Sequence, residues 1–220
     1  MKKAIIFGTA AFAEVARVYL DADSEYNVTA FTVHERYIEK DTLLGLPIVP
    51  FERLTETHPP DEYDIFVALG FGKVNKSRTN VLVEVKAAGY RPLTYISSQT
   101  HHVGHFEIGE NCFVFENNVI QPFVRIGDNT ILWSGNHIGH HSTIGNNCFI
   151  ASHVVISGQV TIGDSCFIGV NATFRDGITV APECVIGAGA LILKDTIPRG
   201  VYKTKGTDPA SITSDQLRNF

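Results

Sequence analysis

The sequence predicts a chain in two parts: an N-terminal unit in which strands alternate with helices, followed by a β-solenoid. Two observations carry this prediction. Up to about residue 95, short apolar runs alternate with segments of helical spacing. From residue 108 onward, large apolar residues recur every sixth position without a break. We therefore expect an α/β domain over residues 1–95 and a second, all-β domain with a C-terminal cap over residues 96–220.

In the first part, the apolar run Lys3–Phe7 predicts a strand, and Ala11–Leu20 has the spacing of a helix after the turn at Gly8. Three further segments continue the alternation: strands at 27–33 and 64–68, and a helix at 73–88 that ends before a glycine. The segments 45–50 and 58–60 are rich in Gly and Pro, so we expect breaks there and only a short helix between them. This order predicts a small Rossmann-like βαβ domain with a parallel sheet.

The second part has a period of six. A large apolar residue stands at every sixth position, and we call these the beat positions. A helix repeats every 3.6 residues and a simple strand every two, so neither produces this period. Each repeat is therefore interpreted as one flat face with one inward side chain, followed by a corner. Three faces would make one coil of eighteen residues, and stacked coils would form a solenoid. The fifteen beat positions are Ile108, Val114, Ile120, Ile126, Leu132, Ile138, Ile144, Ile150, Ile156, Ile162, Ile168, Phe174, Val180, Ile186 and Ile192.

Other positions follow the same beat. Glycine often comes directly after it, as in Gly139 and Gly145, and we attribute this to corner backbone angles that glycine tolerates. Four positions after the beat the residues are mostly small, and all four cysteines fall there. We expect these cysteines to be interior filling, with a metal or disulfide ladder as the alternative. Asn118 and Asn136 are one coil apart and predict an interior amide ladder. We expect the N-terminal domain and residues 196–220 to cap the two ends of the solenoid.

Composition excludes several classes of protein. The chain has 18 Lys and Arg against 23 Asp and Glu, a net charge of −5, with no basic block, so nucleic acid is not an expected partner. No window approaches the ~20 apolar residues of a membrane span, and the apolar stretch after Met1 is too short for a signal peptide. We therefore expect a cytoplasmic protein with no membrane partner.

The hexapeptide run resembles that of the left-handed parallel β-helix acyltransferases. Together with the preceding βαβ domain, which begins Ile5-Ile6-Phe7-Gly8, the whole chain resembles the bacterial sugar-nucleotide N-acetyltransferases, relatives of sialic acid O-acetyltransferases. The resemblance implies a homotrimer that binds acetyl-CoA between adjacent β-helices and a nucleotide-linked amino sugar at the N-terminal domain, in the synthesis of bacterial surface glycans such as lipopolysaccharide O-antigen. It implies no metal.

The segment His137-Ile138-Gly139-His140-His141 resembles the family's catalytic segment, which maps the general base onto His140. A histidine, with an ordinary pKa of about 6.5, suits the removal of a proton from an attacking amine or hydroxyl. His141 stands where the family has an acidic residue, and it can orient His140 only as a neutral acceptor. By repeat register, the resemblance maps CoA-binding backbone groups and oxyanion donors onto Gly158 and Ala188, and a basic contact to CoA phosphate onto Lys203.

For the sugar nucleotide, the turn Gly8-Thr9-Ala10 occupies the place of a phosphate-binding loop after the first strand, where backbone N–H groups and the helix dipole favour an anion. With one glycine, it is not a full dinucleotide fingerprint. The resemblance adds Glu35, after the second strand, and Gly70, after the third, as further contacts to the nucleotide.

Two alternatives stay open at this point. The acceptor could be a sugar hydroxyl instead of an amine, which would make the protein an O-acetyltransferase. The chain could also be a non-catalytic protein that has the β-solenoid and binds a sugar nucleotide but does not transfer an acetyl group. A zinc site like that of β-helix carbonic anhydrases requires two histidines five residues apart, and the sequence has none.

Overall fold

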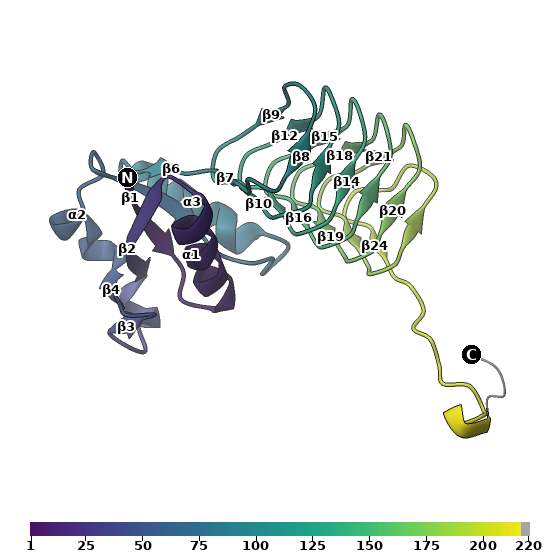
Figure 1. The fold of residues 1–220 in the computed structure, drawn as a ribbon, viewed down its shortest axis with the longest axis horizontal. Coiled ribbons are helices and arrows are strands. Elements are labelled where there is room, and N and C mark those ends of the chain that lie inside the picture. Colours follow the sequence, from purple (N-terminus) through teal and green to yellow (C-terminus); the bar gives the residue numbers. More distant parts are fainter. Residues whose placement is uncertain (217–220) are drawn as a thin grey trace.

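The computed structural model describes residues 1–216 and shows two units, an α/β domain and a triangular β-helix (Figure 1). The first sheet has the strand order β3-β4-β2-β1-β5-β6, and every pairing except β3–β4 is parallel. Its strands are β1 (Lys2–Phe7), β2 (Tyr26–Val33), β3 (Thr42–Leu43), β4 (Leu46–Pro50), β5 (Tyr63–Val67) and β6 (Arg91–Pro92). The helices are α1 (Ala11–Asp23), α2 (Leu54–Thr57) and α3 (Lys76–Ala87), with short 3₁₀ turns at Glu35–Tyr37, Phe51–Arg53 and Ser214–Gln216.

The expected break at residues 45–50 is wrong, because Leu46–Pro50 forms strand β4 beside β2. The turn before it uses left-handed backbone at Leu44 and Gly45, with φ of 49° and 79°. Burial of Ile48 in the core holds the strand in place. Its prolines are tolerated because Pro50 is the last residue of the strand and Pro47 faces only the two-residue edge strand β3. The short middle helix is confirmed as α2.

The second unit is the predicted solenoid with a triangular cross-section, and we number its three parallel sheets. Sheet I has seven strands: β7 (Tyr95–Ile96), β10 (Phe113–Val114), β13 (Ile131–Leu132), β16 (Phe149–Ile150), β19 (Phe167–Ile168), β22 (Val185–Ile186) and β24 (Val201–Tyr202). Sheet II has six: β8 (His101–His102), β11 (Val119–Ile120), β14 (His137–Ile138), β17 (Val155–Ile156), β20 (Thr173–Phe174) and β23 (Leu191–Ile192). Sheet III has five: β9 (Glu107–Ile108), β12 (Arg125–Ile126), β15 (Thr143–Ile144), β18 (Thr161–Ile162) and β21 (Thr179–Val180).

The six-residue beat is confirmed by the register, since each beat residue ends a two-residue strand that pairs with a strand eighteen residues away. Fourteen of the fifteen beat side chains are buried, and Ile108, in the first coil, is half-buried. All four cysteines are buried free thiols. They lie inside the corner that joins sheet III to sheet I, so interior filling is confirmed. The amide ladder is confirmed as well: Asn136 Nδ2 donates to Asn118 Oδ1 at 2.9 Å.

The reason given for the glycines after the beat is wrong. Gly139 and Gly145 do not have left-handed backbone; a Cβ on Gly139 would lie 2.5 Å from the carbonyl carbon of Ser157 in the next coil. Close approach of successive coils therefore requires glycine there. The left-handed residue comes two positions later and is often Asn, as at Asn129 and Asn147, because asparagine tolerates this conformation.

The N-terminal domain packs along the outside of sheet I rather than only capping an end of the solenoid. Phe12 of α1 contacts the rings of Phe113 and Trp133, and Phe71, before α3, contacts those of Phe149 and Phe167. The outward residues of sheet I are thus an aromatic surface that α1 and the segment before α3 cover. Within one chain, the N-terminal domain does not cover the outer faces of sheets II and III.

The buried Arg78 of α3 also joins the two units. Its guanidinium donates to the carbonyl oxygens of Asn129 and Cys148 in the β-helix, at 3.0 and 3.1 Å from Nη2, and to those of Leu69 and Gly70 in its own domain, at 3.1 and 2.9 Å from Nη1. Burial lowers the pKa of Arg78 to about 10, so the group is charged at neutral pH.

The solenoid is longer than the unbroken beat. Strands β7 and β8 begin it before residue 108, and β24 closes sheet I after the beat is lost. Beyond β24 the chain leaves the coil and runs away from the body as an extended segment (Figure 1). Across residues 1–216, no helix combines the length and the apolar character needed to span a bilayer.

Candidate active site

His140 lies at the edge where sheet II meets sheet III, in the corner between β14 and β15. Its side chain is exposed, and its backbone N–H donates to Gln121 Oε1 at 2.8 Å. The corner bends there because Gly139 allows the next coil to approach and His141 takes a left-handed conformation, with φ of 59°. The repeat therefore holds an exposed imidazole at a fixed place on a rigid edge.

The imidazoles of His140 and His141 are in contact, with their Nδ1 atoms 3.1 Å apart. In such a contact one nitrogen carries the hydrogen and the other accepts it. When His140 donates from Nδ1, its Nε2 keeps a free lone pair and can take a proton from a substrate. His141 is itself held by the ring of Phe123, whose centroid is 4.6 Å away. His141 thus has the position needed to orient His140 as a neutral acceptor.

Gly158, one coil beyond His140, is in contact with it. A Cβ on Gly158 would lie 2.8 Å from both Cε1 and Nε2 of His140, so the imidazole occupies the space that a side chain would fill. The backbone N–H of Gly158 does not point to an open site, because it donates to Asp176 Oδ1 at 2.8 Å. In this structure the Gly158 N–H is therefore not free to act as the expected oxyanion donor. The glycine instead makes room for the His140 imidazole.

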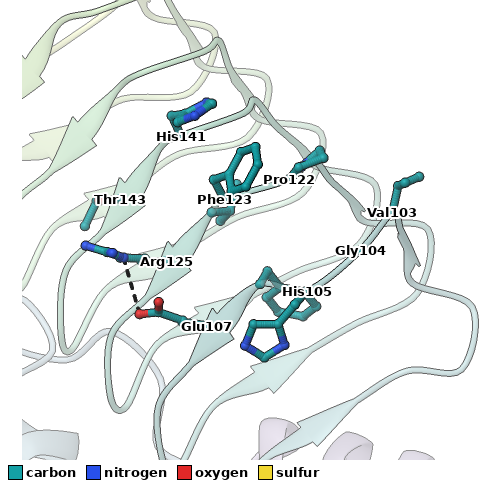
Figure 2. Close-up of a pocket in the computed structure, with 11 residues that line it drawn as sticks. Val103, Gly104, His105, Glu107, Pro122, Phe123, Arg125, His141 and Thr143 are labelled. Atoms are coloured by element: carbon teal, nitrogen blue, oxygen red, sulfur yellow. Dashed lines mark ion pairs between the residues drawn. The ribbon is translucent and has the colours of Figure 1, made fainter.

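A cavity of about 670 Å³ opens beside His141 (Figure 2). Phe123, 67% exposed, lies between His141 and the Arg125–Glu107 ion pair, whose Nε and Oε2 atoms are 3.3 Å apart. His105, from the first coil, lines the same cavity. Among residues 1–216, no three His, Cys, Asp or Glu side chains form a group able to hold a metal ion.

A second cavity, of about 470 Å³, lies at the carboxyl ends of β1, β2 and β5. Gly8, Thr9 and Ala10 line it, as the sequence predicts. Gly8 has φ of 133°, and a Cβ on it would lie 2.8 Å from the carbonyl oxygen of Ala68, so no other residue fits. Parallel sheets bind ligands at this edge of the strands. An adjoining cavity of about 290 Å³ shares Thr9 and Ala10.

Two predicted contacts do not line this cavity. Glu35 turns its carboxylate to Arg53, with Nη2 and Oε1 3.0 Å apart, and the carbonyl of Gly70 is taken by Arg78. The sequence prediction missed the polar residues that do line it: His34, Arg36, Tyr37, Lys73, Ser77, Asn80 and Glu84. His34 Nε2 and Glu84 Oε2 are 2.6 Å apart across it. The rule that strand ends and the first turn of the following helix form such sites would have indicated His34 and Ser77.

Ala188 and Lys203 lie together but away from His140. Thr204, next to Lys203, donates its hydroxyl to the Ala188 carbonyl at 2.6 Å. Ala188 sits at the edge between sheets I and II, between β22 and β23, whereas His140 is at the edge between sheets II and III. One chain therefore brings Gly158 to His140 and does not bring Ala188 or Lys203 there.

Comparison with known proteins agrees with this architecture. A family model described as bacterial transferase hexapeptide (six repeats) matches residues 107–139 and 124–158, and one described as hexapeptide repeat of succinyl-transferase matches residues 159–194. The search of curated proteins gave no significant match.

Several solved structures are similar over nearly the whole chain. PerB from Caulobacter crescentus, solved in complex with CoA and GDP-perosamine, is 22% identical with a TM-score of 0.79, covering 92% of this chain and 92% of that one. The acetyltransferase domain of PglB from Neisseria gonorrhoeae, solved with acetyl coenzyme A, is 22% identical with a TM-score of 0.61, covering 90% and 94%. WeeI from Acinetobacter baumannii is 18% identical with a TM-score of 0.64, covering 92% and 94%. Residues 107–194 thus carry the hexapeptide repeats of bacterial transferases, and the chain has the fold of PerB, an α/β domain followed by a left-handed β-helix.

Proposed function

We propose that this protein transfers the acetyl group of acetyl-CoA to the amine of a nucleotide-linked amino sugar, in the synthesis of bacterial surface glycans. The observation that carries the proposal is the exposed His140 imidazole, oriented through Nδ1 by His141 and fixed against Gly158 on a rigid edge. The pocket at Gly8, of a size for a nucleotide sugar, supports the acceptor class. The folds of PerB, solved with CoA and GDP-perosamine, and PglB, solved with acetyl coenzyme A, support both substrates.

In the proposed reaction, His140 Nε2 takes a proton from the acceptor amine as its nitrogen attacks the thioester carbon. His141 accepts the Nδ1–H of His140 throughout, which keeps the second ring nitrogen directed at the substrate. When the carbon–sulfur bond breaks, the imidazolium returns the proton to the CoA sulfur. The chain needs no metal for this sequence of steps, and its dependence on acetyl-CoA favours a cytoplasmic location.

We also propose that the site forms between copies of the chain in a homotrimer. The nucleotide pocket belongs to the domain that covers sheet I, whereas His140 lies on the edge opposite sheet I, so a single chain keeps the two apart. A neighbouring copy can supply the missing half. Sheet II offers a surface for this contact, since its outward Val119, Val155 and Leu191 are exposed in one chain.

The same arrangement accounts for Ala188 and Lys203. Ala188 lies almost three coils beyond the level of His140, about 13 Å at the ~4.8 Å strand spacing, and Lys203, which follows β24, lies one coil further, at about 18 Å. The extended pantetheine arm of CoA is long enough to span that height. Acetyl-CoA in a groove between two copies would therefore reach His140 of one copy with its thioester and Lys203 of the next with its phosphates.

The test is an acceptor screen that measures CoA thiol release from acetyl-CoA. GDP-, UDP- and dTDP-linked amino sugars, with GDP-perosamine among them, are compared with analogues that carry a hydroxyl in place of the amine. We expect turnover with at least one amino sugar and little with its hydroxyl analogue. Faster transfer to the hydroxyl analogue would make the protein an O-acetyltransferase. Calorimetric binding of a sugar nucleotide without binding of acetyl-CoA would identify a binding protein and refute the proposal.

A further inference from the structure

A carboxylate lies on the same edge as His140, two coils beyond it. His140, Gly158 and Asp176 take equivalent positions in three successive coils, because each follows its strand of sheet II by the same number of residues. Asp176 is fixed there by the Gly158 N–H, which donates to Oδ1 at 2.8 Å. No motif around Asp176 predicts a functional residue at this position.

The Asp176 carboxylate and the Nε2 atom of His140 both lie close to Gly158. The point where a Cβ of residue 158 would stand is 2.8 Å from His140 Nε2 and 3.3 Å from Asp176 Oδ1. His140 Nε2 and Asp176 Oδ1 are therefore at most about 6 Å apart, and Gly158 puts no side chain between them. An ammonium group that binds to Nε2 from the solvent side of Gly158 is then close enough to reach the carboxylate as well.

The carboxylate keeps bonding capacity for a ligand. Oδ2 of Asp176 accepts no hydrogen bond from residues 1–216, and no Lys, Arg or His of that range lies within 4.0 Å of the carboxylate. An ionised carboxylate has about four acceptor positions, of which the Gly158 N–H uses one. A positively charged donor satisfies such a group better than a neutral one, because charge-assisted hydrogen bonds are about twice as strong.

We infer that Asp176 binds the ammonium group of the acceptor and thereby selects an amine over a hydroxyl. The inference rests on the proposed function and names the residue that determines the class of acceptor. An amine reaches the site mostly as R–NH₃⁺, which Asp176 Oδ2 holds by an ion-paired hydrogen bond beside His140 Nε2. A hydroxyl makes no ion pair there and gains no such advantage.

R–NH₃⁺ gives one proton to His140 Nε2, which passes it to solvent. The neutral amine nitrogen forms a bond to the thioester carbon, the carbon–sulfur bond breaks, and a second N–H proton moves through His140 to the CoA sulfur. The products are the N-acetyl sugar, CoA and one proton released to solvent.

The first test compares Asp176→Asn with the wild-type protein on GDP-perosamine and on its analogue with a hydroxyl in place of the amine. The asparagine keeps an oxygen for the Gly158 N–H and removes only the charge. We expect kcat/KM for the amine to fall about 10-fold, mainly through KM, with no change for the hydroxyl analogue. The matched control is Asp164→Asn, because Asp164 Oδ1 accepts the Asn146 N–H at 2.7 Å in the same way, but on the edge between sheets III and I.

A second test does not depend on which sugar is the substrate. CoA carrying an S-(2-aminoethyl) group places an ammonium next to the thioester position, and CoA carrying an S-(2-hydroxyethyl) group is its neutral partner. We expect calorimetry to show about 10-fold tighter binding of the ammonium ligand by the wild type and by Asp164→Asn, and no preference in Asp176→Asn. Equal preference in all three proteins would overturn the inference while leaving the proposed function intact. Failure of every protein to bind either ligand would refute the proposed function itself.

Discussion

Replacement of His140 by alanine is expected to lower kcat by about 10²–10⁴-fold, the usual contribution of a general base, while KM for acetyl-CoA changes little. The reason is geometric. His140 is the imidazole whose Nε2 faces the space above Gly158, and its neighbour His141 turns its Nδ1 toward His140 and its ring toward Phe123. The measurement is the steady-state rate of CoA thiol release with the acceptor found in the screen.

The matched control is His58→Ala, which removes an imidazole from the first domain, where it contacts the ring of Tyr63. We expect this variant to keep the wild-type kcat. The fold of both variants is checked by thermal melting, since His140 is exposed and its loss should leave the melting temperature nearly unchanged. If the His140 variant turns over within a few-fold of the wild-type rate, His140 is not the general base.

The second large effect concerns stability. Arg78→Met is expected to lower the free energy of unfolding by about 3 kcal/mol or more, because it leaves the carbonyls of Leu69, Gly70, Asn129 and Cys148 buried without their donor. Arg78→Lys should also be destabilised, since one ammonium cannot reproduce the planar fork that serves both domains. Urea unfolding followed by circular dichroism measures both changes.

Lys76→Met is the control for Arg78, because Lys76 belongs to the same helix and also reaches the β-helix. Its Nζ is 3.3 Å from Glu183 Oε2, but both side chains are exposed, so the pair should contribute at most about 1 kcal/mol. Equal effects of the two substitutions would mean that the buried guanidinium does not join the two domains as the contacts indicate.

The β-solenoid could be predicted because each of its repeats is stabilised in the same way, by one inward apolar side chain. One apolar side chain every six residues is enough to fix the triangular coil, and the beat from Ile108 to Ile192 therefore gave the register of every strand in that range. Strands β7, β8 and β24 lie outside the beat because His102 and the residues after Ile192 break it. At those ends pairing with a neighbouring coil, rather than the local pattern, determines the structure.

Contacts between the two domains could not be predicted in the same way. Nothing in the local sequence around Arg78 indicates that its partners are carbonyls fifty or more residues away. The same limit applies to Asp176, which meets Gly158 only because the coils stack in register. Glu35 shows the converse case: its position after β2 is the expected one, yet the available Arg53 draws its carboxylate away from the cavity. His140 was found from its motif, and its contact with Gly158 followed from the eighteen-residue coil.

In the proposed homotrimer the nucleotide pocket and the base of one site come from different copies of the chain, and complementation between two variants tests this arrangement. His140→Ala has an intact pocket, and Thr9→Glu, which places a carboxylate where the sugar diphosphate should bind, has an intact base. In trimers formed by co-expressing the two chains in equal amounts, each site draws its halves from neighbouring copies, so about one quarter of the sites should be intact. We predict about one quarter of the wild-type rate, and a rate no higher than that of either variant alone would contradict the shared site.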